Sequence, residues 1–419
     1  MSFYKIKIIK TVFNRTDNQF FKNRKKLKKS KGNSDYVIRT KPEQMTELST
    51  TIGLANLGNT CFLNVVIQAL RLSPPLCIML LSDDIKKRKG SNKEELLDAL
   101  QKLIYDFWKS PLPAGSKPTL MPRAFHNTFL KSIKDSGDDW HSFGQQSDAA
   151  ETIQYILGGV HDATYKTVTM NILGDARNDE EKGYISAIES WRAFFGKEYS
   201  AIVENYHGQT QTAVICENCQ AVSTRYEPWL MLKVPMPGGE LPNRVAVNAS
   251  LTDCLNLAFA DDSLDDYHCD KCNTNGKAII RNRISKLPYV IILTFKRFTN
   301  TMNKVLGKIT WDADKFDFGP WMAFGGDPFN RYYTPHMYDT TALIEHQGSF
   351  RGGHYLMYAK QEKQWYEYDD NAIKNVPGET AMGADTYIAF MTRRNVAAFM
   401  DAQMRRVIMD LRAGAAAEA

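Results

Sequence analysis

Two Cys-x-x-Cys pairs constrain the path of this chain more than any other feature of its sequence. The pairs are Cys216/Cys219 and Cys269/Cys272, and far more chain separates them than in a compact zinc finger. Four thiolates can close a tetrahedral structural zinc site, so one shared site requires the intervening residues to form a hairpin-like extension that returns to the metal. Two other interpretations stay open, a redox pair and four unligated thiols. His268 is a further candidate ligand, which a complete set of four cysteines makes unnecessary.

A second constraint comes from a cysteine at the start of a predicted helix. Cys61 comes directly before an apolar run, so Asn59 or Thr60 is expected to cap the helix and to place the thiol at the positive end of its dipole. A thiol with an ordinary pKa of about 8.5 attacks only as its thiolate, which a helix N-terminus or a nearby imidazolium favours. Such a nucleophile also needs a base and a group that orients the base.

Candidates for the base and the orienting group lie far downstream. Residues 354–359 and 364–369 alternate apolar and polar positions on either side of a polar turn, which predicts a hairpin with His354 beside Asp369. Cys61, His354 and Asp369 would then act as nucleophile, base and carboxylate, with Asn56 and the Cys61 backbone N–H as donors to an oxyanion. Individually, a buried Cys, a Gly-Asn turn and a lone His are usually structural. Only their combination favours catalysis.

Taken together, these segments resemble the ubiquitin-specific protease family. Residues 53–68 are similar to its Cys box and residues 344–370 to its His box. Further segments are similar to its acidic motif, its central strand and its last strand, at residues 145–151, 287–298 and 387–391. The resemblance covers residues 51–395 and implies an α+β, papain-like cysteine peptidase with a helical thumb, a β-rich palm and zinc-tipped β fingers at residues 205–285. Such fingers would grip the globular part of ubiquitin.

The resemblance also implies substrate-binding residues. Asp148 and Glu151 share one face of a predicted helix and would face the basic C-terminal tail of ubiquitin, and Tyr355 would contact the substrate as well. Ser147 separates Gln146 from Asp148 in this chain, so no role is assigned to Gln146.

Two adjacent carboxylates compete for the third catalytic role. By position Asp369 matches the triad member of the family, whereas Asp370 is assigned to positioning the oxyanion or a water. Phe62 and Val65 stand where the family often has Tyr and Ser. These changes alter the polarity near the helix and leave the reacting groups intact.

Charge is unevenly distributed along the chain of 419 residues. Residues 1–50 hold 13 Lys and Arg against 4 Asp and Glu, whereas the whole chain has a net charge of +6. The basic run at residues 24–31 is typical of a nuclear-localisation or nucleic-acid-binding segment, or of a solvated arm. No apolar run is long enough for a membrane span, and seven cysteines without an obvious pairing scheme fit a reducing compartment. We therefore expect an intracellular protein of the nucleus, the cytoplasm or both.

Two more helices are predicted from apolar spacing. Residues 94–109 carry a core-facing stripe, and residues 396–411 are amphipathic. The sequence therefore divides into a basic extension (1–50), a catalytic domain (51–395) and a C-terminal helix with an Ala-rich tail (396–419). We expect this last helix to dock on the core rather than to bind a partner or a membrane, because Asp401 and Asp410 reduce the positive charge of its polar face.

The expected function is thiol-dependent hydrolysis of the bond after the C-terminal glycine of ubiquitin, with structural Zn²⁺ and no catalytic cofactor. Ubiquitin and ubiquitinated proteins would be the partners, and an import receptor or nucleic acid could bind the basic extension. Three alternatives remain: a protease for another ubiquitin-like modifier, a catalytically silent ubiquitin-binding scaffold, and a basic nucleic-acid protein with zinc knuckles.

Overall fold

The computed structural model describes the chain from residue 51 onward with short gaps. The described residues are 51–417 except 83–84, 86, 89–90, 110–117, 138–140, 143, 173–175, 239–245, 247, 300–301, 326–335, 362 and 383–385. The basic extension at residues 1–50, with the import-receptor and nucleic-acid contacts expected of it, lies outside these residues.

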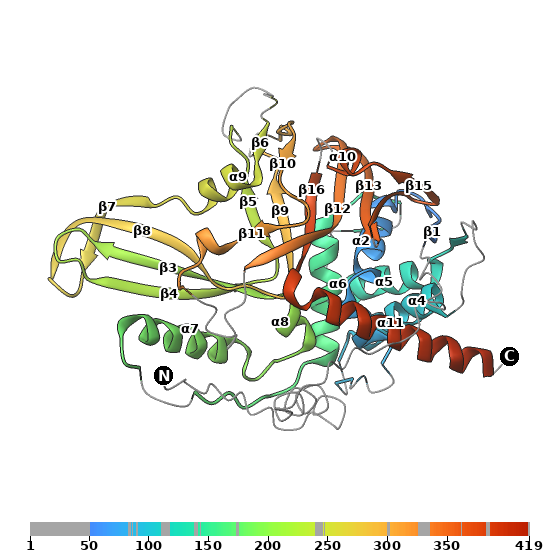
Figure 1. Cartoon of the computed structure of the whole chain (residues 1–419), viewed down its shortest axis with the longest axis horizontal. Coiled ribbons are helices and arrows are strands. Elements are labelled where there is room, and N and C mark those ends of the chain that lie inside the picture. Colours follow the sequence, from blue (N-terminus) through green and yellow to red (C-terminus); the bar gives the residue numbers. More distant parts are fainter. Residues whose placement is uncertain are drawn as a thin grey trace, which may run out of the picture.

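Helices make up most of the first half of the described chain (Figure 1). Their bounds are α2 (Cys61–Arg71), α3 (Pro74–Leu80), α4 (Glu94–Trp108), α5 (Arg123–Asp135), α6 (Ala149–Thr164), α7 (Asp179–Phe195), α8 (Ala201–Tyr206), α9 (Leu251–Ala258), α10 (Gly378–Ala381) and α11 (Arg394–Ala417). The helix expected at 94–109 is confirmed as α4, and the helix expected to carry Asp148 and Glu151 is confirmed as α6, with Asp148 as its N-cap. The helices α2, α4 and α5 gather at the end of the molecule opposite the long β extension.

Strands dominate the second half. Their bounds are β1 (Gly53–Leu54), β2 (Thr119–Leu120), β3 (Gly208–Cys216), β4 (Val222–Trp229), β5 (Leu232–Pro235), β6 (Ala249–Ser250), β7 (Asp262–Cys269), β8 (Thr274–Lys286), β9 (Val290–Lys296), β10 (Ile309–Thr310), β11 (Phe316–Asp317), β12 (Met337–Ser349), β13 (Gly352–Gln361), β14 (Gln364–Asp369), β15 (Ala372–Val376) and β16 (Thr386–Arg393). The large sheet has the order β15-β14-β13-β12-β16-β9-β5, with β11 paired to β12. This sheet is the palm, and the hairpin expected around His354 is its β13–β14 pair.

The thumb and the palm meet along α2. All eleven residues of α2 are buried, including Asn64, Gln68 and Arg71, whose side chains make hydrogen bonds. Its last residue, Arg71, is fully buried and donates to the Tyr368 hydroxyl of β14 at 3.3 Å, while its guanidinium lies over the rings of Phe107 and Trp108. One side chain of α2 thus contacts both α4 and the palm, which fixes the C-terminal end of α2 relative to the sheet.

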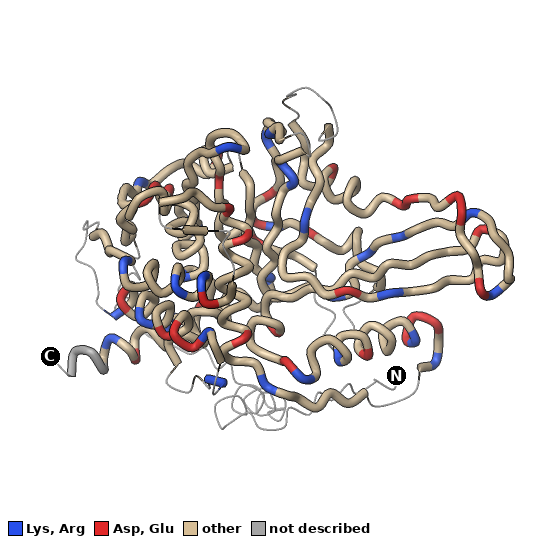
Figure 2. The backbone as a smooth tube through the Cα atoms, turned by 180° about the vertical axis from the view of Figure 1, so that it is seen from behind, with Lys and Arg blue, Asp and Glu red and all other residues tan. Residues whose placement is uncertain are grey.

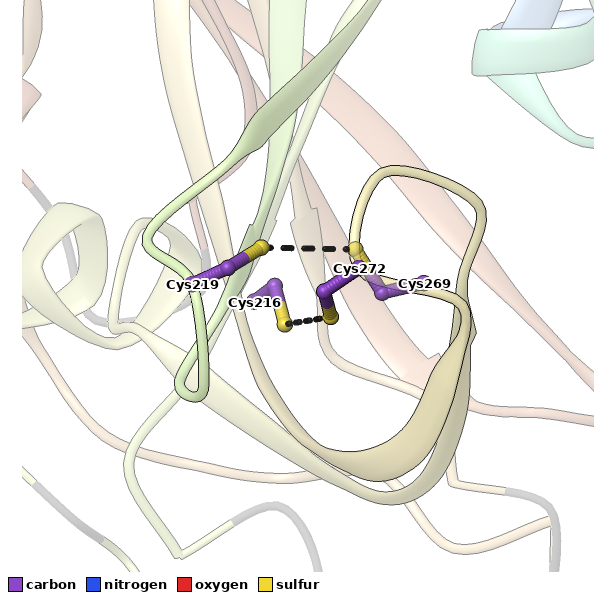
Figure 3. A group of neighbouring side chains, drawn as sticks. All are labelled: Cys216, Cys219, Cys269 and Cys272. Carbon is purple, nitrogen blue, oxygen red and sulfur yellow. Dashed lines mark hydrogen bonds between the residues drawn. The ribbon is translucent and has the colours of Figure 1, made fainter.

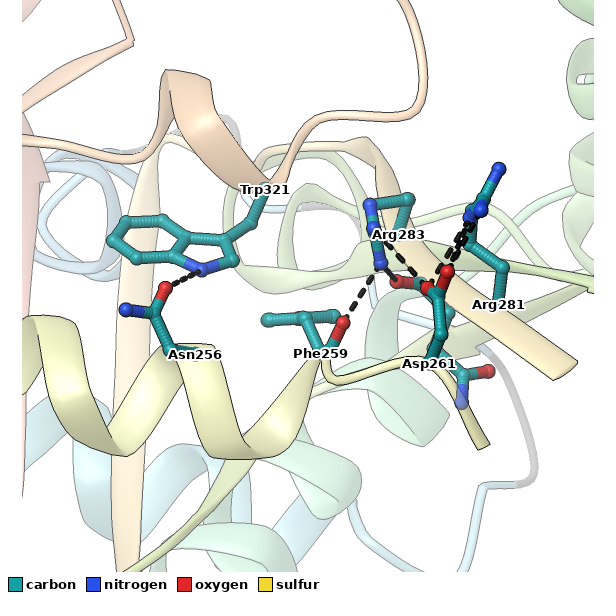
Figure 4. Close-up of polar contacts among 7 residues, drawn as sticks. Asn256, Phe259, Asp261, Arg281, Arg283 and Trp321 are labelled. Carbon is teal, nitrogen blue, oxygen red and sulfur yellow. Dashed lines mark hydrogen bonds and ion pairs between the residues drawn. The ribbon is translucent and has the colours of Figure 1, made fainter. Parts of the chain in front are cut away.

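The fingers are a separate four-stranded sheet of order β4-β3-β8-β7 that projects away from the palm (Figure 1). An ion-pair cluster anchors their base: Asp261 accepts from Arg281 at 2.7 Å and from Arg283 at 3.3 Å (Figure 4). Because Asp261 directly follows the α9 segment and both arginines lie on β8, these contacts join the loop before β7 to the neighbouring strand. Beside them, the Trp321 indole donates to Asn256 at 3.1 Å and holds α9 in place.

The C-terminal helix α11 docks on the helical side of the molecule, as favoured from the sequence. Met404 and Ile408 are buried, and the Arg412 side chain donates to the carbonyl of Trp108 at the end of α4 at 3.0 Å. Phe399 is 45% exposed and therefore lies outside the buried face of α11. Within the described residues, no single helix is long and apolar enough to cross a membrane, and only the bent pair α2 and α3 passes such a test together.

Candidate active site

Cys61 is the first residue of α2 and its side chain is 3% exposed. The expected side-chain cap is absent. Thr60 holds the cap position without capping, because its hydroxyl accepts from the backbone N–H of Leu57 at 2.9 Å, and Asn59 turns away to donate to the carbonyl of Gly144. The first N–H groups of the helix are thus directed to the thiol, since backbone hydrogen bonds of Cys61 and Phe62 both lower the pKa of Cys61.

The net pKa of Cys61 is nevertheless raised above its ordinary value. Burial is the largest cause, because it disfavours the charged thiolate. A hydrogen bond from the backbone of Tyr355 lowers the pKa, and the negative charge of Asp370 raises it again. In the free protein, burial therefore outweighs the donors at the helix N-terminus.

His354 and Asp369 face each other across the β13–β14 hairpin. The Nε2 atom of His354 lies 2.6 Å from Oδ1 of Asp369, and the two side chains are 40% and 47% exposed. A ring held through Nε2 presents Nδ1 for proton exchange with a thiol. Within the described residues no hydrogen bond joins His354 to Cys61. However, Tyr355, the next residue, donates its backbone N–H to the Cys61 sulfur, so His354 directly precedes the point where the palm contacts Cys61.

Asp370 belongs to a different network from Asp369. Its Oδ2 accepts from the Asn56 amide at 2.8 Å and its Oδ1 accepts from the Asn64 amide at 2.7 Å. The Asn56 carbonyl oxygen in turn accepts from the backbone of Gly58 at 2.9 Å. Both ends of the Asn56 side chain are therefore held, with the second Nδ2 hydrogen available for another acceptor. The structure separates the two carboxylates: Asp369 orients the imidazole and Asp370 orients Asn56.

The acidic pair on α6 has two different environments. Asp148 is the N-cap of α6, where one oxygen accepts from the backbone of Ala150 at 2.6 Å and from that of Glu151. Its other oxygen accepts from the Tyr387 hydroxyl of β16 at 2.7 Å. Glu151 is exposed, and its pKa is raised by partial burial and by the charge of Asp148. Among the described residues, the Glu151 side chain has no hydrogen-bond or ion-pair partner, unlike Asp148.

Tyr355 contributes to the site through its backbone. Its ring is 6% exposed, and its hydroxyl interacts with the backbone of Ala149 at the start of α6. Burial raises the pKa of this hydroxyl. The side chain therefore joins the palm to the thumb, whereas the N–H contacts the Cys61 sulfur.

Gln146 was not assigned a role from the sequence, yet it contacts the segment that carries His354. Its amide nitrogen donates to the carbonyl of Gly353 at 2.9 Å, and its amide oxygen accepts from the N–H of Gly353 at 3.0 Å. The sequence feature that could have identified Gln146 was its position just before the acidic pair, within the segment similar to the acidic motif of the family. The inserted Ser147 obscured it, although Ser147 only turns aside to bond His141 at 2.6 Å.

The four paired cysteines converge at the tip of the fingers (Figure 3). The sulfur of Cys216 lies 4.0 Å from that of Cys272, and the sulfur of Cys219 lies 3.7 Å from that of Cys269. Tetrahedral ligands with Zn–S bonds of about 2.3 Å have sulfurs about 3.8 Å apart. Both loops close with a residue at positive φ after the second cysteine, at Gln220 and Asn273. The donor set and its geometry fit one structural zinc ion.

A cavity of 310 Å³ lies between α6 and the base of the fingers. Gln154, Gly158 and His161 line it from α6, and Trp229 lines it from the end of β4. These α6 residues continue the helical face on which Glu151 lies, so the acidic residue and the cavity form one continuous surface between the thumb and the fingers.

The structure has the papain-like fold of cysteine peptidases, with a cysteine at a helix start on one side and a histidine with its carboxylate on a neighbouring sheet. The sequence model described as "Ubiquitin carboxyl-terminal hydrolase" matches residues 52–391, and the chain belongs to this family.

Individual relatives agree with this assignment. The chain is 26% identical to ubiquitin carboxyl-terminal hydrolase 4 of Saccharomyces cerevisiae, covering 83% of this chain and 40% of the relative. It is 28% identical to ubiquitin carboxyl-terminal hydrolase Usp2 of Drosophila melanogaster, covering 87% and 37%. The chain thus spans less than half the length of these relatives. A chain of the SAGA DUB module solved with monoubiquitin has a similar fold, with a TM-score of 0.64, 19% identity and coverage of 91% and 76%.

Proposed function

We propose that this protein is a deubiquitinating cysteine peptidase that hydrolyses the bond after the C-terminal glycine of ubiquitin. The observation that carries the proposal is the contact of the Cys61 sulfur with the Tyr355 backbone, one residue after an imidazole held by Asp369. Membership of the hydrolase family supports the same reaction.

The mechanism follows from the arrangement of these groups. His354 takes the proton of Cys61 through Nδ1, and Asp369 stabilises the imidazolium. The thiolate attacks the glycine carbonyl, and the developing oxyanion accepts from the second Nδ2 hydrogen of Asn56 and from the Cys61 N–H. His354 then protonates the leaving amine, and water hydrolyses the thioester.

Substrate binding completes this arrangement. In the free protein the Cys61 pKa is raised by burial and no hydrogen bond joins Cys61 to His354. A substrate tail that inserts beside α2 brings the imidazole and the thiol together, since catalytic hydrogen bonds often tighten only in the bound complex. Cys61 of the free protein therefore favours the protonated thiol, and ubiquitin binding favours the thiolate.

Ubiquitin recognition uses the surface between the thumb and the fingers. Glu151 is free to pair with basic groups of the tail, and the cavity beyond it receives apolar side chains. Zinc held by Cys216, Cys219, Cys269 and Cys272 would lock the finger tip as a rigid structural element. Without such a clamp, a sheet with much of both faces exposed has little core of its own to stabilise it.

Reaction with a ubiquitin C-terminal electrophile tests the proposal. The wild-type protein should form a covalent adduct, whereas Cys61→Ala and His354→Ala should not. Parallel reactions with electrophiles built on other ubiquitin-like modifiers test the alternative substrate class. Faster labelling by one of them would favour that modifier over ubiquitin. Ubiquitin binding without any adduct would instead support the silent scaffold and refute the peptidase.

A role in nucleic-acid binding rests on the extension alone. Basic and acidic residues are interspersed over the described chain (Figure 2), so the positive excess belongs to residues 1–50. We infer that residues 24–31 direct nuclear import. Unchanged nuclear accumulation after replacing their lysines with alanine would refute this inference. Nucleic-acid binding is assigned to the extension as well, and salt-dependent binding that survives deletion of residues 1–50 would refute that assignment.

A further inference from the structure

Beside His354, the edge of β13 that faces away from β12 pairs with no strand among the described residues. The N–H of Gly353 donates to Gln146, so the polar backbone groups of Gly353 face away from β12. On that side β14 pairs with β13 only from Met357 onward. Backbone groups alternate along a strand, so Gly353 and Tyr355 both present N–H and C=O to this uncovered edge.

Both exposed positions of this edge have partners from the thumb. The Tyr355 N–H is bonded to the sulfur of Cys61. Two residues earlier, Gly353 exchanges a donor and an acceptor with the side-chain amide of Gln146, at 3.0 and 2.9 Å. One residue that both donates to and accepts from a single partner is the pattern of a hydrogen-bonded pair in an antiparallel sheet. The amide of Gln146 therefore makes the two bonds that an extended peptide makes when it adds to a strand edge.

The neighbouring residues hold the side-chain amide of Gln146 beside Gly353. On one side Ser147 bonds to His141, and next to it Asp148 caps α6. On the other side, a Cβ on Gly352 would lie 2.7 Å from the amide oxygen of Gln146, and Gly352 has a φ of +152°. The glycines before His354 thus leave the space that the glutamine fills.

We propose that Gln146 is an intramolecular plug, whose amide occupies the backbone-binding edge of β13 that an extended Gly-Gly substrate takes next to Cys61. Substrate entry then requires the exchange of two bonds of Gln146 for two bonds of the substrate backbone. The identity of that substrate rests on the proposed peptidase function, whereas the plug is a property of the free chain.

The test compares two reagents that alkylate Cys61. A Gly-Gly chloromethyl ketone needs the edge of β13, whereas iodoacetamide is too small to use it. Gln146→Ala should raise the ratio of the two alkylation rates by about tenfold, as expected for two neutral hydrogen bonds of ordinary net strength. Gln146→Met keeps the length of the side chain without its polar groups and should match Gln146→Ala. Gln145→Ala, a neighbouring exposed glutamine, should match the wild type.

An unchanged or lower ratio in Gln146→Ala, with wild-type thermal stability, overturns the plug. A lower ratio in particular would mean that Gln146 aligns the substrate. The ubiquitin electrophile keeps the two proposals separate. If it labels the wild type while the ratio stays flat, the plug fails and the peptidase stands. If it does not label the wild type while the ratio rises in Gln146→Ala, the peptidase fails and the plug stands.

Discussion

Replacing Asp370 with asparagine separates the two adjacent carboxylates most sharply. Asp370 accepts one amide on each oxygen, Asn56 at 2.8 Å and Asn64 at 2.7 Å. An asparagine has only one acceptor oxygen, and its NH₂ group would face one of these two donors. Asn64 is buried and also donates to the carbonyls of Leu54 and Ala55, so the exposed Asn56 is the residue that loses its partner.

The size of the effect follows from the bond that is lost. A hydrogen bond to a charged group contributes about 1.5–3 kcal/mol, which lowers the population of correctly oriented Asn56 by about 10- to 100-fold. We expect Asp370→Asn to lower kcat by this factor with little change in KM, measured with a fluorogenic ubiquitin substrate. In an Asn56→Ala background the same substitution should cost almost nothing, because the residue it positions is gone.

The alkylation rate of Cys61 should rise in Asp370→Asn, whereas kcat should fall. The charge of Asp370 raises the pKa of Cys61, so Asp370→Asn lowers that pKa and increases the thiolate fraction at neutral pH. Iodoacetamide should therefore alkylate Cys61 faster in the variant that turns over more slowly. Additive losses in the double-mutant cycle, or slower alkylation, would refute the assignment of Asp370 to Asn56.

Three further predictions concern the helix cap, the other thiols and the fingers. Asp148→Ala should cost about 1 kcal/mol of stability through the lost cap and lower Tm by a few degrees, whereas Glu151→Gln should leave Tm unchanged and raise KM. Burial raises the pKa of Cys77 to about 12, so mass spectrometry after alkylation at pH 8 should find Cys61 labelled and Cys77 protected. The purified protein should hold one zinc ion by elemental analysis, and Cys219→Ser should lose it and increase proteolysis within the fingers.

Local patterns were enough to predict the elements that carry the site. Apolar spacing predicted the helix that became α4, and alternation predicted the hairpin that brings His354 to Asp369, because each depends on residues close together in the chain. The two Cys-x-x-Cys pairs likewise predicted their own convergence, since thiols that share an ion must meet wherever the chain between them goes.

The tertiary structure decided how these groups behave. The sequence alone identified the candidate nucleophile, base and thiol ligands and roughly which elements bear them. Whether Cys61 is ionised, which carboxylate holds the imidazole, and what Gln146 contacts depended on burial and on hydrogen bonds between residues hundreds of positions apart. Burial determines how much free energy it costs to ionise a group, and long-range packing determines which acceptor each donor meets. Neither can be read from a short segment of sequence.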